Sequence, residues 1–203
     1  MADSSSPLGL LGTLRLLLNS FPPDAPPYCV IGALAVGAWG QPRATKDIDL
    51  LILLEESTQP AFTAWLETAG FTLDEDWARQ NPLMKGRGMR LRHRSHPVDL
   101  MIPGDAHERE ALTRRVSLII EGQPVWMATP EDLILLKLKA CRDRDLVDAL
   151  SIVLRQASRL DLDYLWRWRI GWACKASFTT SSALHPHPEA CTAYSRLATH
   201  QGK

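Results

Sequence analysis

Three aspartates are spaced in a way that could hold a divalent metal ion. Asp47 and Asp49 begin one apolar stretch, and Asp99 interrupts another. Because side chains of a β-strand alternate between its two faces, Asp47 and Asp49 would project to the same side while Ile48 enters the core. Two carboxylates held so close repel each other unless a cation neutralises them. Oxygen-only ligation favours Mg²⁺ or Mn²⁺ over zinc.

The third acid would complete the site if its strand lay beside the strand of the first two. Asp99 lies within the β-prone residues 97–101, where an acid requires an explanation. With three carboxylates, two metal ions about 4 Å apart could orient an attacking hydroxyl and a leaving phosphate. The pattern therefore predicts phosphoryl or nucleotidyl transfer, in which Asp99 could also help to deprotonate the acceptor.

A nucleoside triphosphate also needs hydrogen-bond donors, and a turn before a short helix can supply them. Gly32 and Ala33 follow the apolar residues 28–31, so their backbone amides would lie at a helix N-terminus. Arg43 and Thr45 add a charge and a hydroxyl just before the acids, and Arg43 is the better placed to reach a phosphate. A DxD pair alone is more often structural, but this combination favours a metal–nucleotide site.

The hydrophobic pattern predicts the elements that would position these residues. Leucines at helical spacing predict a helix over residues 8–21, which the following prolines end. Mixed strands first and helices afterwards predict an α+β fold, with a mixed β-sheet flanked by helices and a C-terminal helical part. The other expected elements are strands over 28–31 and 47–54, hairpins over 89–102 and 117–127, and helices over 33–39, 59–69, 107–115, 144–157 and 162–170, with one more helix starting after Thr129.

We expect four regions along the chain. Residues 1–27 would form an N-terminal helix and a proline-rich connector, residues 28–127 the core, and residues 128–170 the helical part. Residues 171–203 would be a disordered tail, because serine, threonine, alanine and histidine become frequent there and periodicity fades.

Composition argues against several classes of protein. A chain of 203 residues, 45% of them hydrophobic, suffices for one core, and a formal charge of zero gives no general attraction to nucleic acid or to a membrane. The four cysteines form no CxxC pair, which disfavours a zinc site or a disulfide framework and fits a reducing cytoplasm. Arg15 interrupts the N-terminal leucines, so we expect neither a signal peptide nor a membrane span.

Two stretches carry a family resemblance. The sequence IGALA at residues 31–35, followed by RATKDIDL at residues 43–50, resembles the signature of the nucleotidyltransferase superfamily of polymerase-β type. It is most similar to the AbiEii-like toxin nucleotidyltransferases. The second stretch resembles that family's KLxA…RDxxD helix motif, with TPEDL at 129–133, KLKA at 137–140, RD at 144–145 and then Asp148.

The resemblance implies the nucleotidyltransferase fold and a division of roles within the first stretch. Asp47, Asp49 and Asp99 would bind Mg²⁺ or Mn²⁺, and the Gly32 turn would hold the nucleoside triphosphate. Many relatives have glycine or serine where this chain has Ala33. Alanine keeps the backbone amide but lacks a hydroxyl, so we expect weaker triphosphate binding. The resemblance also makes RNA such as tRNA a candidate acceptor and a cognate antitoxin a candidate partner.

The second stretch implies that Lys137 and Asp145 face the active site. Taken alone, these two side chains are more typical of solvated charges on a helix, since the charged residues 142–144 could break the helix between them. Arg90, Arg92 and Arg94 alternate with apolar residues, so a strand there would present three arginines on one face. That face could contact RNA or the triphosphate, or it could be ordinary solvated surface.

Three functions remain open. The first is transfer of a nucleoside monophosphate to an acceptor hydroxyl, with RNA as a candidate acceptor. The second keeps this chemistry but changes the acceptor to a small molecule such as an aminoglycoside, or to a protein side chain. The third is nucleotide binding without turnover. A basic groove beside the carboxylates would favour RNA, and an acidic pocket would favour an aminoglycoside.

Overall fold

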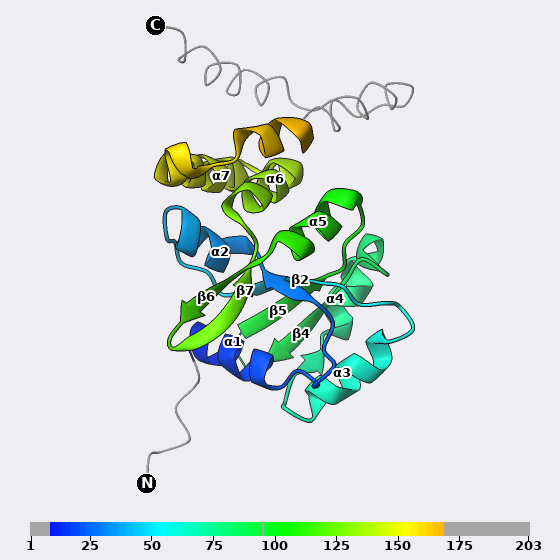
Figure 1. Ribbon diagram of the computed structural model, residues 1–203. Helices are drawn as coiled ribbons and strands as arrows, with labels where there is room; N and C mark the ends of the chain where they lie inside the picture. The colour runs from blue at the N-terminus through cyan, green and yellow to red at the C-terminus, as the bar shows by residue number, and fades with distance from the viewer. Residues whose placement is uncertain (1–8, 95, 169–203) are drawn as a thin grey trace, which may run out of the picture. The chain divides into compact units, whose positions relative to one another are not determined.

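One mixed sheet carries the strands of this chain. The structure is a computed structural model that describes residues 9–94 and 96–168 (Figure 1). Within those residues, seven strands form a sheet in the order β3-β4-β5-β2-β1-β7-β6. β2 pairs with β5 and β1 with β7 in parallel, and the other pairs are antiparallel. The strands are β1 Tyr28–Val30, β2 Ile48–Ile52, β3 Thr72–Leu73, β4 Gly88–His93, β5 His96–Met101, β6 Val116–Ile120 and β7 Gln123–Met127.

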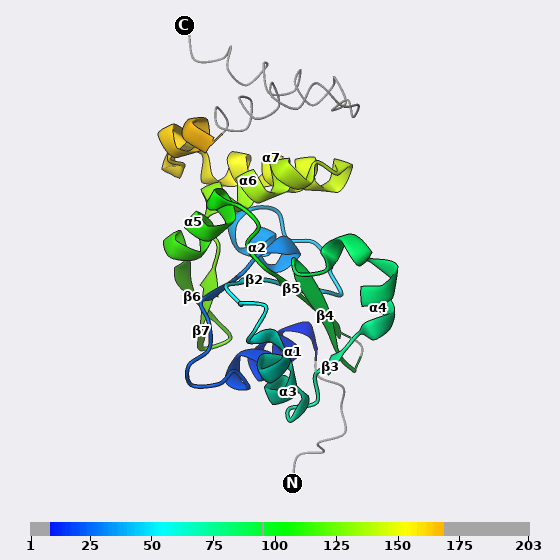
Figure 2. The same ribbon diagram turned by 90° about the vertical axis from the view of Figure 1, so that its right-hand side faces the viewer.

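Helices flank the sheet. In both views α1 and α3 lie on one side of it, and α2, α5, α6 and α7 lie on the other (Figures 1 and 2). The predicted α+β class, a mixed sheet flanked by helices, is therefore confirmed. Along residues 9–94 and 96–168, no helix combines the length and the apolar character that crossing a membrane requires. The labelled helices are α1 Leu10–Asn19, α2 Gly32–Trp39, α3 Gln59–Glu67, α4 Glu75–Gln80, α5 Ala106–Arg114, α6 Pro130–Ala140 and α7 Asp143–Gln156, with short 3-10 turns at Pro82–Met84 and Ala157–Arg159. Residues 162–168 are helical as well.

Most expected elements occur, with ends that differ by a residue or two. The predicted cap of α6 is present, because the Thr129 hydroxyl accepts a hydrogen bond from the backbone amide of Asp132. The sequence did not predict β3 and α4. β3 has two residues, too few to show a periodic pattern. α4 is capped by Asp74, whose carboxylate accepts a hydrogen bond from the Trp77 amide at 3.1 Å.

The β4–β5 hairpin turns earlier than the sequence suggested. We expected a loop at residues 95–97, whereas His93 pairs directly with His96, so only residues 94 and 95 separate the strands. Arg94 has a φ of 53°, in the left-handed region that tight hairpin turns require. The expected strand face of three arginines is therefore wrong, because Arg94 belongs to the turn. The early turn also sets the register in which Arg90 lies opposite Asp99.

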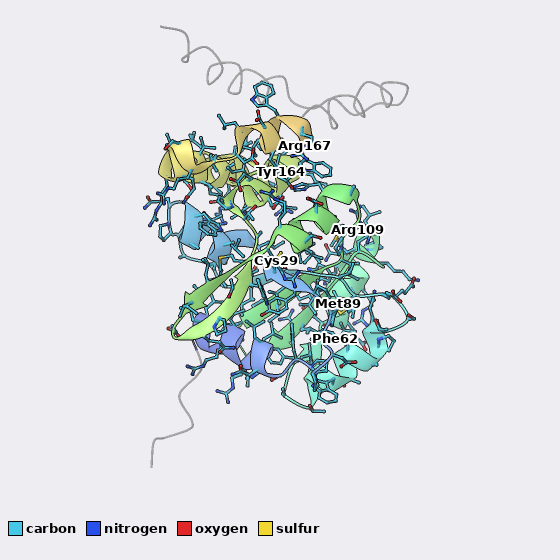
Figure 3. The ribbon with its side chains drawn as sticks, viewed as in Figure 1. Cys29, Phe62, Met89, Arg109, Tyr164 and Arg167 are labelled. Carbon is cyan, nitrogen blue, oxygen red and sulfur yellow. The ribbon has the colours of Figure 1, made fainter. Side chains whose placement is uncertain are left out.

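An apolar layer fixes the central strands. Cys29 of β1 is fully buried and Met89 of β4 is almost so (Figure 3). The connector after α1 is held by aromatic contacts, since the ring of Phe21 packs edge-on against Tyr28 at 5.2 Å and against Phe62 of α3 at 5.4 Å. These contacts hold the start of β1 in place, and β1 leads into the Gly32 turn.

The C-terminal end of α2 is bound by side chains of α7. Gln156 donates a hydrogen bond to the carbonyl of Trp39 at 2.6 Å, and Arg155 donates to the carbonyl of Gly40 at 2.7 Å. Ser151 accepts a hydrogen bond from the amide of Gln41 at 3.1 Å. These contacts satisfy backbone groups that a helix end leaves unpaired, and they join α2 to α7.

The chain divides into two compact units, Met1–Leu162 and Asp163–Lys203. In the second unit, the rings of Tyr164 and Trp168 pack edge-on at 6.4 Å, and Arg167 lies over the Tyr164 ring (Figure 3). The tail expected over residues 171–203, and the last two residues of the helix expected over 162–170, lie outside the described residues. The predicted region boundaries at residues 28, 128 and 171 stay predictions.

The contact between α2 and α7 predicts opposite effects for two glycines. A β-carbon at Gly40 would lie 2.4 Å from the Ser151 hydroxyl and 3.0 Å from the amide of Ile152. We expect Gly40→Ala to lower the free energy of unfolding by about 1–3 kcal/mol, because the helices must move apart. Gly37→Ala is the control within α2, where an added β-carbon meets no atom of the described structure within 4 Å. It should raise the free energy of unfolding by about 0.5–1 kcal/mol.

Urea unfolding of both variants measures these differences. Equal stability of Gly40→Ala and the unmodified protein would contradict the close approach of the two helices.

Candidate active site

The sheet places acids from two strands in one row. The parallel pairing of β2 with β5 puts Asp49 opposite Asp99, and the antiparallel pairing of β4 with β5 puts Arg90 opposite Asp99 from the other side. Directly paired residues project from the same face of a sheet, so Asp49, Asp99 and Arg90 share one face. Asp47 directly precedes β2. The expected adjacency of the Asp99 strand and the Asp49 strand is confirmed.

The Gly32 turn lies against the first acid of this row. The amide of Ile31 donates a hydrogen bond to the carbonyl of Asp49 at 2.9 Å, which fixes the start of α2 beside β2. Gly32 has a φ of +64°, and a β-carbon there would lie 1.9 Å from Oδ2 of Asp49. Only glycine fits both requirements.

Amide donors of the first turn of α2 lie at the same place. Ala33 follows Gly32 in that turn, and its side chain is buried. Ile31 occupies the N-cap position, and in the described structure no side chain caps this helix. The first amides of a helix carry a partial positive charge and lack intrahelical acceptors. They can therefore bind an anion such as a phosphate.

Negative charge accumulates at Asp49. Burial and then the charges of Asp99 and Asp47 raise the pKa of Asp49 to about 6, against the opposing effects of Lys137 and Arg90. A shift in this direction means that the ionised carboxylate lacks sufficient compensating charge. A divalent cation would supply it, and the all-oxygen donor set suits Mg²⁺ or Mn²⁺.

Arg90 binds Asp99, the third acid of the expected metal site. Its Nε and one terminal nitrogen each donate a hydrogen bond of 2.6 Å to a different oxygen of Asp99. The guanidinium carbon lies over the Trp77 ring, 5.3 Å from its centre. Within the described residues, no three ligating side chains already surround a common metal position. The structure thus gathers the predicted carboxylates, but it holds Asp99 with an arginine.

A second charged cluster covers this region from the helical side. Lys137 of α6 contacts Asp145 at 2.7 Å and Asp148 at 2.9 Å, both from α7, and Arg43 donates two hydrogen bonds to Asp148 at 2.9 and 3.0 Å. Lys137, Asp145 and Asp148 are buried. The interpretation of Lys137 and Asp145 as solvated surface charges is therefore wrong.

The break between α6 and α7 brings this cluster together. Cys141 adopts a left-handed conformation, with a φ of 52°, and ends α6. The chain then reverses, so Lys137 and Asp145 meet across two packed helices. Lys137 lowers the pKa of Asp49, which places the cluster within electrostatic range of the sheet acids. Oδ2 of Asp145 is buried and accepts no hydrogen bond from any residue that the structure describes.

Two residues expected to bind nucleotide have other contacts in this structure. The hydroxyl of Thr45 accepts a hydrogen bond from the amide of Asp47 at 3.3 Å, so Thr45 positions the acid. Arg43 pairs with Asp148, and this hydrogen bond is the main reason that the pKa of Arg43 is raised. Arg92, expected on a free basic face, contacts Asp74 at 2.6 Å.

Sequence analysis missed the roles of Arg90 and Asp148. A two-residue hairpin at residues 94 and 95 would have placed Arg90 opposite Asp99, but the histidine and proline at 96 and 97 suggested a longer loop. Asp148 was visible only as part of the motif. Its position three residues after Asp145 puts both acids on one helix face, which was the available signal.

Comparison with known proteins identifies the fold. No protein-family model matches the sequence, and no curated protein matches it. The solution structure of the antibiotic-resistance factor ANT(2'')-Ia matches with a TM-score of 0.58 and 15% identity, over 83% of this chain and 96% of that one. The crystal structure of ANT(2'')-Ia in complex with adenylyl-2''-tobramycin matches with a TM-score of 0.52 and 14% identity, over 81% and 97%. The chain therefore has the nucleotidyltransferase fold.

Proposed function

We propose that this protein is a metal-dependent nucleotidyltransferase that moves a nucleoside monophosphate from a nucleoside triphosphate to an acceptor hydroxyl. The observation that carries the proposal is the pairing of β2 with β5, which sets Asp49 opposite Asp99 beside the Gly32 turn. The fold shared with ANT(2'')-Ia supports it, because that fold can host this chemistry. Fold alone would not suffice, since function depends on the site.

The acids have distinct roles in this proposal. Asp47, Asp49 and Asp99 would hold Mg²⁺ or Mn²⁺, which when bound would neutralise charge on the transferred phosphate. Asp99 lies between Asp49 and Arg90 in the row, and its carboxylate would accept the proton of the acceptor hydroxyl. Thr45 would keep Asp47 in place through the backbone hydrogen bond to its amide.

The nucleotide would lie between the Gly32 turn and the helical cluster. The amides of Gly32 and Ala33 would donate to phosphate oxygens, since α2 has no side-chain cap within the described residues. Arg43 pairs with Asp148, but 28% of its side chain stays exposed, so its guanidinium group would also contact the phosphates. Asp145 would accept a hydrogen bond from the nucleotide through its unsatisfied Oδ2.

A small hydroxylated molecule is the acceptor that this arrangement favours. The basic strand that would favour RNA is neutralised, because Arg90 pairs with Asp99 and Arg92 with Asp74. ANT(2'')-Ia, which shares the fold, has been crystallised with an adenylylated aminoglycoside, adenylyl-2''-tobramycin. The toxin role, the RNA acceptor and the cognate antitoxin stay predictions that the next experiment addresses in part.

A transfer assay tests the reaction and the acceptor together. The protein is incubated with each labelled nucleoside triphosphate and Mg²⁺, and with either total RNA or a panel of aminoglycosides and other polyhydroxylated amines. We expect label to pass to a small molecule, and Asp49→Asn to lower the rate at least about 100-fold, because charge stabilisation worth several kcal/mol is lost. Asp24→Asn, the same change at an exposed connector position, is the control.

Each result bears on a different part of the proposal. Equal rates for Asp49→Asn and the unmodified protein would contradict the metal site. Transfer to RNA alone would replace the small-molecule acceptor while keeping the reaction. Binding of triphosphate without transfer to any acceptor would favour a nucleotide-binding protein that does not turn over.

The Gly32 turn gives a second prediction. We expect Gly32→Ala to lower the transfer rate at least about tenfold, because the new β-carbon displaces the Asp49 carboxylate by more than catalysis tolerates. Alanine held at this positive φ should also lower the free energy of unfolding by about 1–2 kcal/mol. Gly37→Ala, in the same helix, should keep the full rate. Single-turnover kinetics and urea unfolding measure the two effects, and an unchanged rate in Gly32→Ala would exclude the close approach to Asp49.

A further inference from the structure

Arg90 and Asp99 form a bidentate ion pair within the row of sheet acids. Two guanidinium nitrogens contact two separate carboxylate oxygens, each at 2.6 Å, in the bidentate geometry that makes such pairs strong. Both side chains are mostly covered, with 23% and 19% of their surfaces exposed. Covered pairs are weakly screened by water and salt, so this contact is expected to persist in solution.

We propose that Arg90 is a built-in counter-ion that competes with the metal for Asp99, and that Asp99 becomes a metal ligand only when the guanidinium group releases it. The inference rests on the proposed function, since it concerns the metal of that reaction. It assigns to Arg90 a positioning role, because Arg90 acts through Asp99. It also explains why the predicted carboxylates are gathered without forming a complete metal site.

Repulsion between cations is the physical basis of the competition. Asp99 offers the same two oxygens to the arginine and to a metal. A divalent ion bound there would lie only a few ångströms from the positive guanidinium group. The arginine must therefore move away, or the metal must bind with fewer ligands and lower affinity.

An Arg90 side chain released from Asp99 would have an aromatic ring close by. The Trp77 ring already faces the guanidinium group at 5.3 Å. Asp74 also lies nearby, since its amide donates a hydrogen bond of 2.8 Å to the backbone carbonyl of Arg90, but its carboxylate already accepts hydrogen bonds from the Trp77 amide and from Arg92. The Trp77 ring is therefore the group that a released guanidinium would keep as a neighbour.

Arg92 is a matched control. It lies two residues further along β4 and makes a 2.6 Å contact with Asp74, so it resembles Arg90 in type, strand and pairing. Its side chain is 60% exposed, and its partner is outside the row of sheet acids. Removing its charge should therefore leave metal binding almost unchanged.

Metal affinity without nucleotide tests the competition. Binding of Mn²⁺ is measured by electron paramagnetic resonance in the full chain, in Arg90→Gln, in Arg90→Lys and in Arg92→Gln. We expect Arg90→Gln to bind Mn²⁺ at least about fivefold more tightly, a typical lower bound for coupling between two ligands. Arg90→Lys keeps the charge but loses the bidentate geometry, and should fall between the two. Arg92→Gln should match the unmodified protein within about twofold.

Two further measurements locate the effect. The effect of Arg90→Gln should disappear when residue 99 is already asparagine. The double variant should therefore bind Mn²⁺ as tightly as Asp99→Asn alone, because the ion pair is absent from both. Thermal unfolding should show a lower Tm for Arg90→Gln without metal, and a larger rise in Tm on adding Mn²⁺. Arg90→Lys serves the same comparison if Arg90→Gln folds poorly.

The outcomes separate this inference from the proposed function. Mn²⁺ binding that is equal or weaker in Arg90→Gln overturns the competition and leaves the nucleotidyltransferase proposal standing. Tighter Mn²⁺ binding by the double variant than by Asp99→Asn alone also overturns it, because the arginine would then act elsewhere than on Asp99. Absence of Mn²⁺ binding in every variant overturns both proposals.

Discussion

Repulsion between adjacent, partly buried carboxylates is the constraint on which the arrangement of this protein depends. Asp49 and Asp99 lie opposite each other on neighbouring strands, with Asp47 just before them, and the pKa of Asp49 is raised to about 6 as a result of burial and of these neighbours. The fold compensates from two sides, through Arg90 on β4 and the Lys137 cluster on the helices. Under the proposed function, a bound divalent cation would supply the positive charge that is still missing.

The helical part contributes structure and charge through the same residues. Lys137 joins α6 to α7 because it contacts two acids of α7, while Arg43 joins the loop before β2 to one of those acids, Asp148. A buried pair of this kind adds little stability beyond an apolar contact, yet removing one partner leaves an uncompensated charge. The cluster therefore fixes where α6 and α7 lie relative to Asp49, and its main effect is geometric.

Local patterns predicted the elements, and long-range pairing decided the site. The Thr129 cap, the glycine turn and the acid-bearing strands follow from neighbouring residues, so the sequence was sufficient for them. The partner of Asp99 depends on where the β4–β5 hairpin turns, and the turn that begins at residue 94, in place of the expected loop at residues 95–97, replaces a free basic face with an ion pair. The contact of Lys137 with Asp145 depends on a helix break at Cys141, which no local pattern specifies. The metal and nucleotide roles stay predictions.

The closeness of Gly32 to Asp49 has a consequence for how this chain can change over generations. A side chain at position 32 and a carboxylate at position 49 exclude each other sterically, because a β-carbon would lie 1.9 Å from the acid. The two positions are thus epistatic: position 32 cannot gain a side chain while the acid remains, and a shorter side chain at position 49 would only reduce the clash, because the β-carbon of residue 49 would itself lie 2.8 Å away. A descendant without the reaction would be free to change position 49 but would still meet strain at position 32, where the φ of +64° disfavours any side chain, and a descendant with the reaction would keep both residues together.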